Sequence, residues 1–169
     1  MNAWTGFLGL AAMLLALSAG AAESRQADSV ASPPLVLKDI NGTPHDLEAY
    51  KGQVVLVNFW AGWCPPCREE MPSMQRLKEK MAGRPFVMLG VDSGESAADL
   101  DGFLEKVQVD FAILFDPDGA ATRRWKVYAL PTSFLVDPQG RVRHVITGPK
   151  EWDGQEALSL IESLLEGNR

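Results

Sequence analysis

Apolar and polar positions in the middle of the chain first follow the period of a buried strand and then that of a helix. Residues 54 to 60 are almost all apolar, with Asn58 as the one exception, which predicts a strand buried on both faces of a sheet. The apolar side chains that come next recur at helical spacing, namely Met71, Met74, Leu77 and Met81. The pattern therefore predicts a buried strand followed by a helix that packs against the sheet.

The same alternation continues along the rest of the chain. Further strands are predicted at residues 86–91, 111–115, 132–136 and 141–146, and further helices at residues 100–107, 120–127 and 157–165, the last with Asp153 as its cap. This order is typical of an α/β protein. We expect a central mixed sheet flanked by helices on both faces.

The region before residue 54 has a different character. Residues 35 to 37 and the Asn41-Gly42 turn predict a short N-terminal β-hairpin, followed by a helical turn over residues 46–50. Residues 23–34 are poor in large apolar groups and end in Ser-Pro-Pro, a composition typical of a flexible tether. We therefore expect one domain over residues 35–169.

The first 22 residues carry no charged side chain and contain an apolar stretch at residues 7–17. That stretch is short for a membrane span, and Ala19-Gly20-Ala21 follows it as a small-residue cleavage pattern. We interpret residues 1–22 as a signal peptide, with an uncleaved anchor as the alternative because the segment lacks Lys and Arg. Export would place the chain in a compartment where disulfides persist.

The net charge of the chain argues against two classes of binding partner. The formal net charge is −6, and no cluster of basic residues suggests binding to nucleic acid or to an anionic membrane surface. We expect a monomer that works on other proteins.

The chain contains only two cysteines, Cys64 and Cys67. Two thiols are too few for a disulfide framework or for a structural zinc site, which usually has four Cys or His ligands. Covalent haem attachment requires His after the second cysteine, where this chain has Arg68. His45 and His144 lie far from the cysteines in sequence, so we expect no metal site. Redox chemistry within the pair is the better explanation.

The position of the pair explains why it could be reactive. If the strand ends at Trp60 and the helix begins at Cys64, the first sulfur lies at the positive end of the helix, which favours its thiolate. Pro65 and Pro66 suit the first helical turn but lack N–H groups that could point at that sulfur. We therefore expect a less acidic thiol, and a more reducing pair, than at a helix start with free donors.

The run from Asn58 to Pro72, the segment Leu130-Pro131-Thr132-Ser133-Phe134 and the order of elements resemble the thioredoxin superfamily. The resemblance is to its TlpA/ResA-like exported thiol-disulfide oxidoreductases and covers roughly residues 33 to 166. It implies a thioredoxin-like fold, with Cys64 as nucleophile, Cys67 as resolving thiol and Pro131 as a cis-proline that faces the disulfide. It also implies that the redox-active disulfide is the only cofactor.

Glu70 is a further candidate catalytic residue. Cytosolic thioredoxins place a buried acid at the position of Asn58, and an Asn side chain cannot titrate. Glu70 lies three residues after Cys67, on the same side of the helix, and matches the acid that ResA-like members use near their active site. The alternative is that Glu69 and Glu70 only offset the helix dipole.

The resemblance also implies the surroundings of the reaction. We expect Trp63 at the rim of the site, and Pro65, Pro66, Leu130 and Thr132 in contact with substrate. Substrates of such proteins are exported proteins with disulfides or thiols, including apocytochrome c and the copper-site cysteines of oxidases, and a membrane thiol-transfer protein supplies electrons. Dedicated cytochrome-maturation members carry Glu at the position of Thr132, which weakens that assignment.

Two other functions use the same cysteines. Cys64 and Cys67 could bind Cu(I) as soft ligands in a metal carrier, although a third ligand is missing. A peroxiredoxin-like peroxidase would need its characteristic Pro and Thr ahead of a single peroxidatic cysteine, and neither precedes Cys64 within the matching loop. Thiol-disulfide exchange in the periplasm is therefore the function that the sequence predicts.

Overall fold

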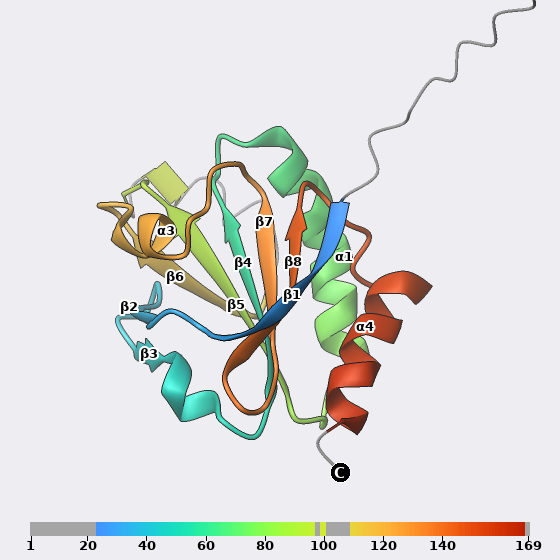
Figure 1. Cartoon of the computed structure of the whole chain (residues 1–169). Helices are drawn as coiled ribbons and strands as arrows, with labels where there is room; N and C mark the ends of the chain where they lie inside the picture. The colour runs from blue at the N-terminus through green and yellow to red at the C-terminus, as the bar shows by residue number, and fades with distance from the viewer. Residues whose placement is uncertain (1–22, 97–98, 101–108, 168–169) are drawn as a thin grey trace, which may run out of the picture.

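A six-stranded sheet organises the computed structural model, which describes residues 23–96, 99–100 and 109–167 (Figure 1). The strand order is β1-β8-β7-β4-β5-β6. In this order the strands are β1 (Glu23–Ala31), β8 (Arg141–Thr147), β7 (Thr132–Val136), β4 (Val54–Trp60), β5 (Phe86–Ser93) and β6 (Ala112–Asp116). The predicted α/β fold with a central mixed sheet is confirmed, since β4 pairs in parallel with β5 and antiparallel with β7.

Helices cover both faces of the sheet, as predicted. Helices α1 (Pro65–Lys80) and α4 (Gln155–Glu166) lie side by side on one face, and α3 (Ala120–Arg124) lies on the other (Figure 1). Every residue of β4 is buried, because a central strand has side chains on both covered faces. The strand therefore forms a rigid support for the segment that follows it.

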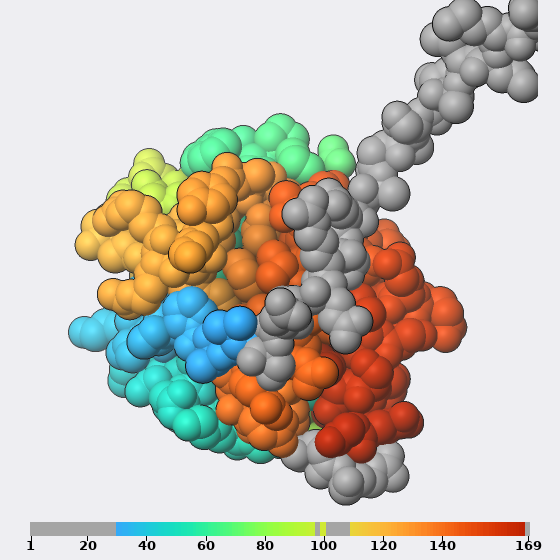
Figure 2. Space-filling model, viewed as in Figure 1, coloured from blue at the N-terminus to red at the C-terminus, as the bar shows by residue number. Residues whose placement is uncertain are grey.

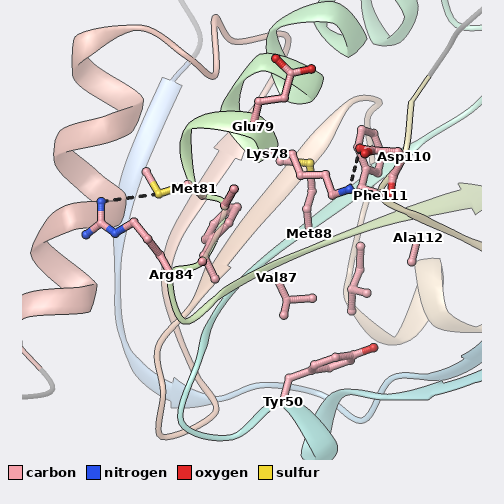
Figure 3. Close-up of a pocket in the computed structure, with 14 residues that line it drawn as sticks. Tyr50, Lys78, Glu79, Met81, Arg84, Val87, Met88, Asp110, Phe111 and Ala112 are labelled. Carbon is pink, nitrogen blue, oxygen red and sulfur yellow. Dashed lines mark hydrogen bonds and ion pairs between the residues drawn. The ribbon is translucent and has the colours of Figure 1, made fainter.

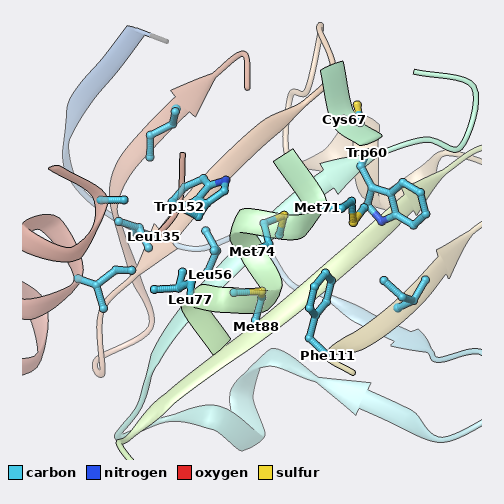
Figure 4. Packing of buried hydrophobic residues seen from close by; sticks show 14 of the residues in the cluster. Leu56, Trp60, Cys67, Met71, Met74, Leu77, Met88, Phe111, Leu135 and Trp152 are labelled. Atoms are coloured by element: carbon cyan, nitrogen blue, oxygen red, sulfur yellow. The ribbon is translucent and has the colours of Figure 1, made fainter. Parts of the chain in front are cut away.

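Each face of the sheet has its own apolar core. Under α1 and α4 the core contains Trp60, Met71, Met74, Leu77 and Trp152, and Cys67 lies at its upper end (Figure 4). Under α3, the rings of Trp125 and Phe134 meet edge to face with centroids 4.9 Å apart, and Phe59 of β4 contacts both. The methionines thus fill the core beside the cysteines.

The N-terminal hairpin is also confirmed. Strands β2 (Val36–Lys38) and β3 (Pro44–Asp46) pair antiparallel, and Gly42 in the turn between them has φ +80°, a conformation that favours glycine. The 3-10 helix η1 (Leu47–Tyr50) follows, and the Asp46 side chain accepts a hydrogen bond from the Glu48 backbone N–H at its start.

The segment expected as a flexible tether, residues 23–34, differs from the structure. Its larger part forms β1, which pairs antiparallel with β8 at the edge of the sheet. Pairing at an edge uses backbone N–H and C=O groups, so a strand can form there without the apolar alternation that sequence reasoning looks for.

The cap predicted for the last helix is wrong: Gly154 is the N-cap of α4, and Asp153 instead accepts a hydrogen bond from Arg76 Nε at 2.8 Å. The helix expected at residues 100–107 lies almost entirely outside the described residues, as does the whole segment 1–22. Within the described ranges, no helix is long and apolar enough to cross a membrane.

Candidate active site

Cys64 and Cys67 form a disulfide at the junction between β4 and α1. Cys64 is the N-cap of α1 and has an extended backbone, and its C=O accepts the first helical hydrogen bond, from the Arg68 N–H. Cys64 as a residue is 4% exposed, whereas Cys67, one turn into the helix, is 0% exposed. The order of access is therefore the one expected of an attacking thiol and a resolving thiol.

Pro65 and Pro66 occupy the first two positions of α1, as the sequence predicts. An N-cap side chain normally accepts hydrogen bonds from the second or third helical N–H, and the second position here is a proline without that donor. Cys67 N–H is the first backbone donor of the helix. The stabilisation available to a Cys64 thiolate thus comes from fewer donors than at most helix starts.

Pro131 lies at the same end of the sheet as the disulfide. The Leu130–Pro131 peptide bond is cis, as the resemblance implied, and β7 begins directly after it. Thr132 pairs with Phe59, one residue before the end of β4. The Thr132 hydroxyl donates a hydrogen bond to the Ala129 carbonyl at 2.8 Å, so this side chain stabilises the loop that precedes β7. In Figure 2 the green segment after β4 and the orange segment before β7 meet at this end of the molecule.

Two exposed aromatic side chains belong to the segments at this end. Trp63, which sequence analysis placed at the rim, is 66% exposed. Tyr128, two residues before Leu130, is 90% exposed and was not singled out from the sequence. Large exposed aromatic residues are frequent in protein interfaces, and this is the signal that could have identified Tyr128.

Glu70 is buried beneath the cysteine turn and accepts three hydrogen bonds. Its Oε1 accepts from Asn58 Nδ2 at 2.9 Å, and its Oε2 accepts from the Lys150 backbone N–H and from Trp152 Nε1, both at 3.1 Å. Burial raises the pKa of Glu70 from 4.5 to about 7, although these three donors oppose the change. A carboxyl group that titrates near neutrality can both accept and release a proton at physiological pH.

Asn58 connects three elements around Glu70. One amide N–H group on Nδ2 donates to Glu70 Oε1, and the other donates to Ser133 Oγ at 2.8 Å. The Ser73 hydroxyl adds a second link, because it donates to the Glu70 carbonyl and accepts from the Trp152 N–H at 3.0 Å. Sequence analysis missed Ser73, Ser133 and Trp152, since only the tertiary fold brings them to Glu70.

The polar cluster of the N-terminal hairpin and the cavity described below lie away from the cysteine pair. Within the described ranges, no three His, Cys, Asp or Glu side chains are grouped so that they could hold a metal ion. His45 lies in the N-terminal hairpin and contacts Tyr50 and Asp39. A cavity of about 440 Å³ opens beside the C-terminal end of α1, where Lys78 pairs with Asp110 (Figure 3). Its lining does not include either cysteine.

Comparison with known proteins agrees with this geometry. Residues 30–145 match the AhpC/TSA family. The thiol-disulfide oxidoreductase ResA of Geobacillus thermodenitrificans is 37% identical over 117 residues, which cover 69% of this chain and 67% of that protein.

Solved structures show the same likeness. A putative thiol:disulfide interchange protein DsbE from Chlorobium tepidum superposes with a TM-score of 0.77 at 30% identity, covering 83% of this chain and 99% of that one. StoA from Bacillus subtilis superposes with a TM-score of 0.65 at 26% identity, covering 78% and 97%. The cysteine pair at the start of α1, the cis-proline at the same end of the sheet and these relatives together place the chain in the thioredoxin-like AhpC/TSA family, as a ResA-like thiol-disulfide oxidoreductase.

Proposed function

We propose that this protein reduces disulfide bonds of exported proteins through the Cys64 and Cys67 thiols. The observation that carries the proposal is the position of Cys64, which caps α1 at the end of the sheet where the cis-proline segment enters β7. A substrate strand beside Pro131 would bring its disulfide to Cys64, the less buried of the two cysteines. Trp63 and Tyr128 supply exposed aromatic surface for contact with that substrate.

The exchange proceeds in two displacements. The Cys64 thiolate attacks one sulfur of the substrate disulfide, the substrate S–S bond breaks, and its other sulfur leaves as a thiolate that takes up a proton. The Cys67 thiolate then attacks Cys64 Sγ in the mixed disulfide and releases the second substrate thiol. Two electrons have passed to the substrate, and the Cys64–Cys67 disulfide has formed. A membrane thiol-transfer protein returns two electrons and two protons to the pair.

Glu70 accepts the proton of Cys67 before the second displacement. Its carboxyl group lies one helical turn after Cys67 and has a pKa of about 7, so it is partly ionised under the conditions of the reaction. Asn58, Lys150 and Trp152 hold the carboxyl group in place in its ionised form.

The Glu70→Gln variant tests this role. It should slow release of product from the mixed disulfide by about tenfold or more, and the dependence of that rate on pH near neutrality should disappear. Stopped-flow measurement of product release at several pH values gives both results. Glu69→Gln is the matched control, because Glu69 is an exposed neighbour on the same helix. Equal rates and pH profiles for Glu70→Gln and the wild type would remove Glu70 from the mechanism.

Trapping in the cell tests the substrate class. A Cys67→Ala variant retains Cys64 but cannot complete the second displacement, so exported partners should remain attached as mixed disulfides that a reductant releases. A variant with both cysteines replaced by alanine is the control and should capture none of them. The proposal fails if the single variant captures no more than this control in cells where the wild-type pair is reduced.

Export to the periplasm is part of the proposal and rests on the uncharged, apolar segment at residues 1–22. Maturation of cytochrome c or assembly of an oxidase copper site are candidate pathways, with Thr132 in place of Glu as the point against the first. A fusion to a reporter phosphatase that is active only outside the cytoplasm tests export. Activity that depends on residues 1–22 is expected, and its absence would contradict the localisation.

A further inference from the structure

Asp92 is a buried acid that the exchange reaction does not use. It is the seventh residue of β5, pairs with Trp60 in the strand register and is 0% exposed. Neither of its carboxylate oxygens has a hydrogen-bond partner of good geometry among the described residues, and the nearby backbone N–H of Glu95 lowers the pKa of Asp92 without offsetting its burial. A buried carboxylate with so little stabilisation is unfavourable, so this group is more stable if it carries a proton or shares one.

The group with which Asp92 can share a proton is the carboxyl group of Glu95, three residues along the chain, with which it interacts. Gly94 lies between them with φ +83°, and this conformation turns the chain so that Glu95 returns toward the end of β5. Burial, and next the Glu95 carboxylate, raise the pKa of Asp92 well above its ordinary value. Asp116 at the end of β6 acts in the same direction, and its carboxylate is already satisfied by the N–H groups of Ala121 and Thr122.

Glu95 in turn holds the segment that carries Cys64. Its Oε2 accepts a hydrogen bond from the backbone N–H of Gly62, two residues before Cys64. The contact is close: a Cβ atom on Gly62 would lie 3.2 Å from Glu95 Oε1 and 3.2 Å from Leu100 Cδ2. The carboxyl group of Glu95 therefore packs directly against the loop between β4 and α1.

We propose that Asp92 and Glu95 are positioning residues for the dithiol, in which one shared proton keeps Glu95 on the Gly62 N–H and so fixes the loop that leads to Cys64. The protonated carboxyl group of Asp92 donates a hydrogen bond to Glu95, so the pair carries one negative charge instead of two. Glu95 keeps one oxygen for Gly62. The inference depends on the Cys64–Cys67 pair and not on which substrate it serves.

The arrangement predicts a change when Asp92 loses its proton. Two negative charges then face each other, one of them fully buried, and the pair separates. Glu95 moves from Gly62, the loop loosens, and Cys64 is no longer held at the start of α1. The added negative charge also disfavours the Cys64 thiolate.

The amide proton of Gly62 reports directly on this contact. In the oxidised wild-type protein, in which neither cysteine titrates, its NMR chemical shift should move in one step as the pH is raised from about 6 to about 10, as Asp92 ionises. Asp92→Asn keeps the shape and a donor for Glu95 but cannot ionise, so it should start from the same shift and show no step. Superimposable titrations in the two proteins would overturn the proposal.

The reactivity of Cys64 gives the second readout. In Glu95→Ala, iodoacetamide should alkylate Cys64 at neutral pH about threefold or more slowly than in Glu95→Gln, because both variants remove the same charge and only the amide oxygen of Gln can still accept from Gly62. Asp92→Asn should match the wild type at neutral pH and exceed it above the pH of the Gly62 step. Equal rates for Glu95→Ala and Glu95→Gln, together with wild-type rates for Asp92→Asn at all pH values, would overturn the role. If Glu95→Ala does not fold, the comparison of Asp92→Asn with the wild type still decides the question.

Discussion

Asn58 shows how a single buried polar residue can organise a redox site. It interrupts an otherwise apolar strand, and such an interruption is tolerated when the side chain is hydrogen-bonded. Its two amide N–H groups connect α1 and β7 through Glu70 and Ser133. Glu70 can therefore be ionised inside the protein, because donors from β4 and from the segment between β8 and α4 replace the water it has lost.

Replacing Asn58 by aspartate should destabilise the protein in a pH-dependent way. Asn58→Asp places a second carboxyl group within hydrogen-bonding distance of Glu70 Oε1, and two adjacent carboxylates cannot both stay ionised in a buried place. We expect a loss of about 2 kcal/mol in the free energy of unfolding at neutral pH, and a smaller loss in mild acid, where a proton bridges the pair. Urea unfolding at the two pH values measures this. Ser133→Ala is the control, and it should lose about 1 kcal/mol in the free energy of unfolding at both pH values.

At the scale of elements, the start of α1 decides the redox character of the pair. Its first two residues are prolines, so the helix has two fewer N–H groups at its positive end than a helix without them. Only the reduced form contains a Cys64 thiolate, so N–H groups that stabilise this thiolate would favour the reduced form, and their absence favours the oxidised form. The element therefore favours a pair that gives up electrons readily.

The Pro66→Ala variant tests that reading. It restores a backbone N–H at the second helical position, which should lower the pKa of the Cys64 thiol and make the reduction potential less negative by about 30 mV, equivalent to about 1.4 kcal/mol. Equilibration with glutathione measures the potential, and the pH dependence of iodoacetamide alkylation measures the pKa. Pro72→Ala, in the interior of the same helix, is the control and should leave both values unchanged. An unchanged potential in Pro66→Ala would show that the missing donor does not set it.

For the whole molecule, the raised pKa of Glu70 makes stability depend on pH. Between pH 4.5 and about 7 the unfolded chain has released the proton that folded Glu70 still holds, so raising the pH favours unfolding. This group alone should lower the free energy of unfolding by up to about 3 kcal/mol across that interval, with no further change above it.

Glu70→Gln removes this contribution and leaves the other titratable groups in place. The difference in unfolding free energy between the variant and the wild type should therefore grow in favour of the variant from pH 4.5 to about 7 and then stay constant. Urea titrations of both oxidised proteins at several pH values measure it. A difference that does not change with pH would mean that the folded protein does not shift the pKa of Glu70.

The sequence by itself determined the α/β class, the central buried strand, the N-terminal hairpin and the helix start at the cysteines. These follow from local periodicity, from proline and glycine chemistry and from the count of two cysteines, none of which requires distant contacts. The sequence did not show β1, because an edge strand is held by backbone hydrogen bonds to β8 rather than by its own apolar pattern. The three donors to Glu70, and the hydrogen bond from Gly62 to Glu95, were decided only by the tertiary structure. A buried charge depends on partners that are distant along the chain, and only folding brings them together.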